Sequence, residues 1–258
     1  MADAFFLPQG ESTYLATVHT QGPWQEGLQH GGPPAALLGR EIERAADLAP
    51  AETARVTCEI LGPVPVGEVS VRARVTRTGR SVELIEAELE AGGRTAVRAA
   101  AWRIRSTEVD VPPVAYGDPP PLPDPTPELF EHASWVTGYL DAIEWRFTSG
   151  FFAAPGPATA WTRMRQPLLP DEEPSPLQRA LIVADSGNGL SSTLDPARFW
   201  FINPDLSLYL HRAPAGEWVC VEARTSVQRN GIGYAETVLY DTRGPVGRGN
   251  QSLLIGPR

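Results

Sequence analysis

The sequence contains no lysine, and all 22 of its basic residues are arginine. This absence excludes phosphate-binding loops that need a lysine and catalysis through a lysine Schiff base. Cysteine is scarce as well, because only Cys58 and Cys220 occur, each in a strand-like segment. Two such cysteines give neither a disulfide framework nor the spacing of a metal site, so we expect buried thiols and no bound metal.

Long apolar runs are also missing. No run reaches the roughly 20 residues that span a bilayer, and the first ten residues, MADAFFLPQG, contain an acid where a secretory signal has basic residues. We therefore expect a cytoplasmic protein without a membrane span. The net charge of −9 argues against nucleic acid and anionic membranes as main partners. With 258 residues, 42% of them hydrophobic, the chain can form one large domain or two ordinary ones.

The stretch Pro176–Leu190, PLQRALIVADSGNGL, predicts a helix. Its middle, ALIVA, is apolar on every side, which is typical of a helix surrounded by other elements. Asp185 directly follows this apolar run. Because burial disfavours a charged carboxylate, such a residue is usually paired, hydrogen-bonded or functional. Two interpretations stay open: a functional group, or a helix-terminal carboxylate that the backbone of Ser186–Asn188 satisfies.

The first half of the chain predicts a strand, a helix and a four-strand meander. Ser12–Thr20 alternates as a strand, and the sequence HGGPP from His30 begins a helix whose apolar stripe extends to about Leu48. The four later strands are Ala54–Leu61, Glu68–Thr78, Ser81–Glu90 and Arg94–Arg105. Residues 111–127 then hold eight prolines and no periodicity, which predicts an extended linker.

The second half repeats this order. Strands are predicted at Ala142–Ser149 and Thr159–Pro167 before the helix, and at Arg198–His211, Glu217–Val227, Ile232–Tyr240 and Val246–Ile255 after it. Eight identities in 45 positions align the halves at an offset of 149, although the valine alternation fits better at 150, so we expect a one-residue bulge. The prediction is an α+β fold with repeats at residues 1–108 and 128–258, a linker at 109–127, and sheets that wrap around the helices.

Four segments resemble the acyl-CoA thioesterase II family: GLQHGGPPAALL, ADSGNG, NPDLSLYLHR and GNQSLLIG. The resemblance implies a tandem, or double, hotdog fold and hydrolysis of acyl-CoA to a free acid and CoA without a cofactor. In that family an Asp, a Thr or Asn, and a Gln hold the hydrolytic water, and these map onto Asp185, Asn203 and Gln251. Asn203 departs from the form with a hydroxyl there, but an amide can also accept from water and donate to a carboxylate.

Thioester hydrolysis needs a base, groups that orient the attacking water, and donors for the oxyanion. We expect Asp185 to be the base, with Asn203 and Gln251 orienting the water and keeping the carboxylate ionised. Gly31 and Gly32 would offer backbone N–H groups to the oxyanion, because they begin a helix and have no side chain to block a close approach.

Other residues are candidates for substrate binding. Trp24, in the loop before the first helix, either lines an acyl pocket or belongs to the core. Arg229 is the candidate for the CoA phosphates, and only a cluster of arginines around one opening would make such a site. Further candidates are Arg224, Arg243 and Arg248. His30 is expected to cap or pack rather than to act as a base.

The repeat predicts one working site per chain. At the offset of 149, Asn203 matches Ala54 and Gln251 matches Trp102, so the polar set belongs to the second half. On the first helix, Glu41 matches the carboxylate of the second helix, and we expect it on a solvated face beside two arginines.

Structural and functional alternatives remain. Asn203 could be only a turn residue before Pro204, and Gln251 only an edge-strand side chain. The alternative function is a non-catalytic acyl-CoA-binding or lipid-binding protein of the same fold. A hydratase of this fold is disfavoured, because no histidine lies within 25 residues of Asp185. A homodimer of chains is expected by analogy alone.

Overall fold

The computed structural model describes residues 3–125, 138–152 and 154–258. Within these ranges, 13 strands form one antiparallel sheet in the order β1-β2-β4-β5-β6-β3-β10-β13-β12-β11-β8-β7, with β9 also paired to β13. The first elements are β1 (Phe6–Pro8), β2 (Thr13–Ala16), a 3-10 turn (Val18–Thr20), α1 (Gly32–Ala45), β3 (Ala51–Ile60), β4 (Glu68–Arg77), β5 (Val82–Ala91) and β6 (Arg94–Arg105).

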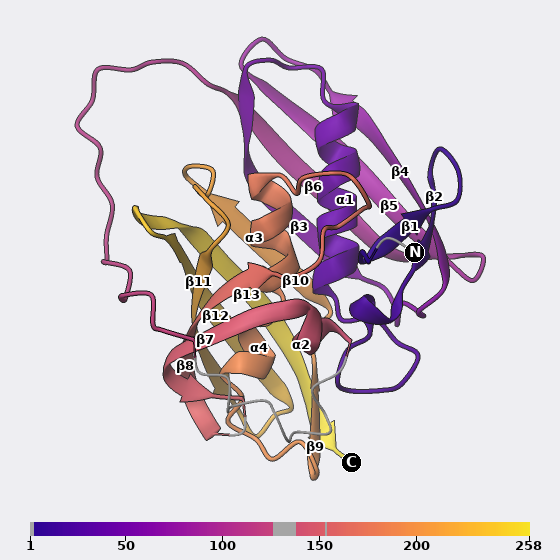
Figure 1. Cartoon of the computed structure of the whole chain (residues 1–258), viewed down its shortest axis with the longest axis vertical. Coiled ribbons are helices and arrows are strands. Elements are labelled where there is room, and N and C mark those ends of the chain that lie inside the picture. The colour runs from indigo at the N-terminus through magenta and orange to yellow at the C-terminus, as the bar shows by residue number, and fades with distance from the viewer. Residues whose placement is uncertain (1–2, 126–137, 153) are drawn as a thin grey trace.

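The later elements follow the proline-rich segment. They are α2 (Tyr139–Ala142), β7 (Ile143–Phe151), β8 (Ala154–Met164), α3 (Pro176–Ala184), α4 (Gly187–Leu190), β9 (Phe199–Ile202), β10 (Asp205–Leu210), β11 (Val219–Val227), β12 (Ile232–Asp241) and β13 (Gly244–Pro257). Figure 1 shows α1 and α3 lying side by side against the sheet. Strands β3 and β10 pair with each other and join the two halves into one sheet.

Alternation along the strands separates the core face from the outer face. In β5, Ile85 and Leu89 are fully buried. The residues between them, such as Glu86 and Glu88, face outward and form ion pairs with arginines of the neighbouring strands. Most buried apolar residues of both halves belong to one hydrophobic cluster that includes residues of α1 and α3, and Trp161, Cys220 and Tyr240 form a smaller second cluster. Because side chains alternate between the two faces of a strand, the apolar positions of each strand lie on the face that covers the helices.

The two central helices approach each other closely. A Cβ atom at Gly39 of α1 would lie 2.4 Å from Cδ1 of Leu181 in α3. The missing side chain therefore lets the two backbones come together. At the start of α3, the Ser175 hydroxyl accepts a hydrogen bond of 3.2 Å from the N–H of Gln178, which caps the helix as Ser commonly does.

The predicted single helix Pro176–Leu190 is wrong in its extent. Helix α3 ends at Ala184, Asp185 is its C-cap, and α4 is a separate turn of four residues. Glycine lowers helix stability, and Gly187 is also needed for packing, since a Cβ there would lie 2.4 Å from Oγ1 of Thr237. The break places the Asp185 side chain at the end of the helix.

Two predicted strands are also divided or shortened. Ser12–Thr20 contains only the short β2 and then a 3-10 turn. Arg198–His211 is interrupted at Asn203 and Pro204, because β9 ends before Asn203 and β10 begins after Pro204. Both pieces pair with β13. Because Asn203 lies outside both strands, its side chain does not have to follow their regular alternation between the two faces of the sheet.

The strand registers correct the offset between the halves. Thr57 pairs with Ala100 and Ser207 with Asn250, so equivalent pairs differ by 150 rather than 149. A bulge between Val75 and Arg77, without a counterpart in β11, produces the local shift to 149.

With the offset of 150, the predicted counterparts in the first half change. Asn203 corresponds to Thr53 rather than Ala54, and Gln251 corresponds to Ala101 rather than Trp102. One polar position therefore does exist in the first half, but the glutamine has no counterpart there.

The proline-rich segment leaves the end of β6, runs in a wide arc and reaches the second half near β7 and β8 (Figure 1). Residues 109–125 contain no helix or strand, while 126–127 of the predicted linker and 128–137 of the predicted second repeat lie outside the described residues. The indole N–H of Trp161 donates to the Pro120 carbonyl at 3.1 Å, and Arg146 donates to the Pro123 carbonyl at 3.0 Å. Among the described helices, none is long and apolar enough to cross a membrane.

Candidate active site

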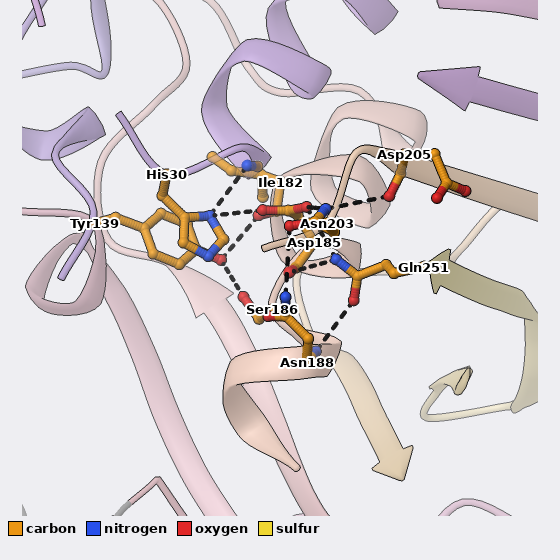
Figure 2. A network of polar contacts seen from close by, with 10 residues as sticks. His30, Tyr139, Ile182, Asp185, Ser186, Asn188, Asn203, Asp205 and Gln251 are labelled. Carbon is orange, nitrogen blue, oxygen red and sulfur yellow. Dashed lines mark hydrogen bonds and ion pairs between the residues drawn. The ribbon is translucent and has the colours of Figure 1, made fainter. Parts of the chain in front are cut away.

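The Asp185 carboxylate lies between the end of α3, the start of α1, strand β13 and the junction of β9 and β10 (Figure 2). Only 5% of the residue is exposed. Its Oδ1 accepts from Nδ2 of Asn203 at 2.7 Å and from Nε2 of Gln251 at 3.1 Å. The backbone N–H of Gly31 donates to the same carboxylate. The structure thus brings the three predicted catalytic residues into one hydrogen-bonded group.

Burial raises the pKa of Asp185 from 3.8 to about 7, because the charged form loses its hydration. The donors Asn203, Gly31 and Gln251 act in the opposite direction and keep this pKa from rising further. A carboxylate that titrates near neutral pH can accept a proton and release it again, which is the property that a general base needs.

Gln251 and Asn203 hold the carboxylate from different sides. Gln251 is 1% exposed, and its Nε2 also donates to the Asp185 carbonyl at 3.1 Å. Its Oε1 accepts from the backbone N–H of Asn188 at 3.1 Å, so both ends of the amide are used. Asn203 also donates to the Asp205 carbonyl at 3.2 Å and lies on the wall of a cavity. Gln251 therefore contacts the carboxylate from behind, and Asn203 from the cavity side.

Asn188 was missed by the sequence analysis as an individual residue, although it lies in the ADSGNG segment. It is buried, lines the cavity, and contacts both amide partners of Asp185. Its Nδ2 has one long contact, 3.5 Å to Oδ1 of Asn203. The short α4 turn, which the helix prediction did not resolve, places it there.

Gly31 and Gly32 lie where the start of α1 meets the end of α3. A Cβ at Gly31 would lie 2.6 Å from Oδ2 of Asp185, and one at Gly32 would lie 2.0 Å from the Ile182 carbonyl. Both residues therefore allow the start of α1 to contact the end of α3. The N–H of Gly32 donates to Nδ1 of His30 at 3.0 Å, and the N–H of Gly31 lowers the pKa of the Asp185 carboxyl. Their contact with an oxyanion stays a prediction.

His30 packs and caps, as expected. Its ring stacks on Tyr139 with centroids 3.9 Å apart and 5° between the planes, and its Nδ1 accepts from the Gly32 N–H at 3.0 Å. Burial lowers the pKa of His30 to about 3, so the ring is neutral. Nδ1 also lies 3.4 Å from Oδ2 of Asp185. The Tyr139 hydroxyl contacts the Ile182 carbonyl at 2.8 Å and the Ser186 hydroxyl at 2.7 Å, a role that no sequence pattern indicated.

A cavity of about 660 Å³ opens beside this group, and Asp185 and Asn203 lie on its wall. Its apolar lining includes Ile60, Val64, Val97, Leu206, Trp200 and Phe201. A second cavity of about 410 Å³ adjoins it, lined among others by Leu140 and Phe152. Trp24, His30 and Arg258 line both cavities.

Trp24 therefore lies on the cavity wall rather than in the core. It is 44% exposed, and its ring meets Phe201 edge to face at 5.1 Å. Cys58 lines the same cavity, and burial raises the pKa of its thiol to about 12, so the thiol is not poised as a nucleophile.

The structure does not place Arg229 at either cavity. Arg229 is exposed in the turn between β11 and β12. The candidate Arg224 forms an ion pair with Glu236 at 2.5 Å. Arg258, which the sequence analysis did not select, lines both cavities.

The carboxylate of α1 that was matched to Asp185 has structural partners. Glu41 accepts from the Tyr14 hydroxyl at 2.8 Å and forms an ion pair with Arg40 at 2.5 Å, so the expected solvated face is wrong. Glu41 lines neither of the two cavities beside Asp185. In the described part of the chain, no group of three or more His, Cys, Asp or Glu residues is arranged to hold a metal ion.

Two family models match the sequence of this chain. A model of the acyl-CoA thioesterase N-terminal domain matches residues 20–104, and one of the C-terminal domain matches residues 116–255. The chain belongs to the acyl-CoA thioesterase family. The search of curated proteins found no match to this chain.

Solved structures share the fold of this acyl-CoA thioesterase family member. The acyl-CoA thioesterase II TesB2 from Mycobacterium marinum is 15% identical with a TM-score of 0.70, covering 98% of this chain and 95% of its own. A conserved hot dog protein of unknown function from Alicyclobacillus acidocaldarius is 14% identical with a TM-score of 0.75, covering 98% and 97%. The tesB protein of Mycobacterium avium subspecies paratuberculosis is 16% identical with a TM-score of 0.69, covering 98% and 96%. The hotdog fold thus extends over the chain.

Proposed function

We propose that this protein hydrolyses acyl-CoA thioesters to a free acid and coenzyme A at a single site on a double hotdog scaffold. The observation that carries the proposal is the buried Asp185 carboxylate, held by two side-chain amides at the wall of a cavity of about 660 Å³. Membership of the acyl-CoA thioesterase family supports the reaction class.

In the proposed reaction, Asp185 takes a proton from a water molecule as the water oxygen attacks the thioester carbonyl carbon. The carbonyl π electrons move to the oxygen and form a tetrahedral intermediate. When the C=O bond reforms, the C–S bond breaks and its electron pair leaves with the sulfur. The proton on Asp185 then passes to the thiolate, which restores the carboxylate for the next turnover. No metal or redox step is needed to balance the atoms and electrons.

The two amides have different roles in this proposal. Asn203, on the cavity wall, is close enough to Asp185 to contact the same water, since its Nδ2 lies 2.7 Å from Oδ1. Gln251 is a positioning residue, because its amide is fully engaged behind the carboxylate. Both donate to the carboxylate and favour its charged, basic form.

The oxyanion needs a donor that is not already engaged. The N–H groups of Gly31 and Gly32 each have an acceptor within the protein. Asn188 lines the cavity, and its Nδ2 has only the contact of 3.5 Å to Asn203. We therefore assign the oxyanion contact to the Asn188 side chain.

The acyl group and the pantetheine arm would occupy the two adjoining cavities. Ile60, Val64 and Leu206 give the larger cavity an apolar surface suited to an acyl chain. Trp24 lies where the cavities meet and would contact the substrate near the thioester.

Thiol release from a panel ranging from acetyl-CoA to palmitoyl-CoA tests this function, with calorimetric titration of the same acyl-CoAs in parallel. Hydrolysis predicts saturable thiol release for at least one chain length. Binding without release would favour the alternative function, a non-catalytic acyl-CoA-binding or lipid-binding protein. Neither binding nor release would contradict both functions.

A further inference from the structure

Two arginines meet at the outer end of the β9–β13 pair, at the opening of the candidate site. The pairing of Phe199 with Pro257 continues to Arg198 and Arg258, and the Arg258 N–H donates to the Arg198 carbonyl at 2.9 Å. Residues directly opposite each other in an antiparallel pair project to the same side of the sheet. Of this arginine pair, Arg198 and Arg258, Arg258 lines both cavities, and Arg198 directly follows Ala197, which lines the smaller one.

Within the described residues, neither guanidinium of the arginine pair forms an ion pair with a carboxylate side chain. Arg258 Nε donates to the Phe199 carbonyl at 3.4 Å, and the Arg198 guanidinium lies over the Phe199 ring at 5.6 Å from its centroid. On the outer face of the first half, by contrast, Arg72, Arg74 and Arg98 each pair with a glutamate. Like charges opposite each other destabilise a strand pair, so an anion bound between Arg198 and Arg258 would remove a repulsion as well as form contacts.

We infer that Arg198 and Arg258 bind the phosphate groups of the coenzyme A part of the substrate. This inference rests on the proposed function, since it assigns one end of the same substrate. Guanidinium groups bind phosphate oxygens through forked hydrogen bonds and keep their charge at any working pH. The arginine pair therefore replaces Arg229, which lies in the turn between β11 and β12 and lines neither cavity.

Three residues that line both cavities mark the path proposed for the pantetheine arm. Arg258 is exposed, Trp24 is partly exposed, and His30 is buried beside Asp185. These three residues line both cavities and so mark the seam between them. A phosphate at the arginine pair would lie at the outer end of this seam, and the thioester at the inner end would reach Asp185.

The test compares two thioesters with the same acyl group, an acyl-CoA and the corresponding acyl-pantetheine, which lacks the nucleotide and all phosphates. The acyl group is the one that the wild-type protein hydrolyses fastest. The variants are Arg198→Gln, Arg258→Gln and the double variant. The matched control is Arg80→Gln, which changes an exposed arginine in the turn between β4 and β5.

The double variant should raise KM for acyl-CoA by about tenfold or more, because it loses the charge-assisted hydrogen bonds to the phosphate oxygens. Its kcat, and both constants for acyl-pantetheine, should stay within about twofold of wild type, as should those of Arg80→Gln. Equal changes for the two thioesters, or an unchanged KM for acyl-CoA, would overturn the inference.

A binding measurement keeps this test independent of catalysis. Coenzyme A is titrated by calorimetry into the wild-type protein and the double variant, and the inference requires weaker binding by the variant. If wild type releases no thiol from any acyl-CoA, the proposed reaction fails, and this titration alone decides the assignment. Absent or unchanged coenzyme A binding would then contradict it.

Discussion

Asp185 is held in a balance between two opposing effects. Burial disfavours its charge, while the hydrogen bonds from Asn203, Gly31 and Gln251 favour it. The outcome is a pKa of about 7 rather than the usual value near 4. A weaker set of donors would leave the acid protonated at neutral pH, and a more exposed site would make it a poor base.

The pH dependence of kcat/KM tests this balance. Because the base must be deprotonated, kcat/KM should rise with pH and level off above about pH 7. Asn203→Ala removes a donor from the charged form, so the midpoint should move to higher pH. Asn203→Thr keeps a hydroxyl donor and should shift it less. A midpoint in Asn203→Ala equal to that of wild type would show that this contact does not tune the carboxylate.

At the scale of elements, the site depends on where regular structure stops. Asp185 caps α3, Asn203 lies between β9 and β10, and Gly31 precedes α1. Regular backbone hydrogen bonding ends at each of these positions, so a side chain or a backbone N–H there can take part in the site. The close contact of α1 and α3 at Gly39 and Leu181 holds the helix ends together.

Substitution of Gly39 tests this helix contact. Gly39→Ala should lower the free energy of unfolding by about 1–3 kcal/mol, since the new methyl group overlaps Leu181. In a Leu181→Ala background the overlap is gone, and the same change should stabilise the protein by up to about 1 kcal/mol through the better helix propensity of alanine. Denaturant unfolding of the four proteins measures both effects. The same effect of Gly39→Ala in both backgrounds would contradict the packing argument.

Sequence patterns predicted the elements better than their ends. Alternation and apolar periodicity gave most strands and both central helices, because these patterns follow from burial on one face. The breaks at Asp185 and at Asn203 were not predicted, since they depend on tertiary contacts such as Gly187 with Thr237. The family resemblance identified Asp185, Asn203 and Gln251 as candidate site residues. Asn188 and Tyr139 could be recognised only from their contacts.

At the scale of the whole molecule, the candidate site uses both halves of the chain. Asp185, Asn203 and Gln251 come from the second half, while Gly31, His30 and part of the cavity wall come from the first. One sheet and one hydrophobic cluster join these halves. Burying the carboxylate lowers the free energy of unfolding, and the packing of both halves offsets this electrostatic cost.

This cost should appear as a pH-dependent difference in stability. Between about pH 4 and 7 the folded protein keeps a proton on Asp185 that the unfolded chain has released, so folding loses stability as pH rises through this window. Asp185→Asn cannot titrate. Its free energy of unfolding relative to wild type should therefore increase from pH 5 to pH 8 by about 2–3 kcal/mol, at about 1.4 kcal/mol for each pH unit between 5 and the pKa of about 7.

Urea unfolding at four pH values measures this difference, and Glu52→Gln, which changes an exposed glutamate of β3, provides the control. The control should differ from wild type by the same amount at every pH. A pH-independent difference for Asp185→Asn as well would mean that the carboxylate keeps an ordinary pKa.

The most direct test of the proposed reaction is the turnover number of Asp185→Asn with the best acyl-CoA substrate. Loss of the general base should lower kcat by roughly 10²-fold or more, while the variant still folds and still binds acyl-CoA. Glu41→Gln, which changes the carboxylate of α1 that was matched to Asp185, should keep the wild-type kcat. A folded Asp185→Asn protein whose kcat equals that of wild type would contradict the assignment of Asp185 as the base.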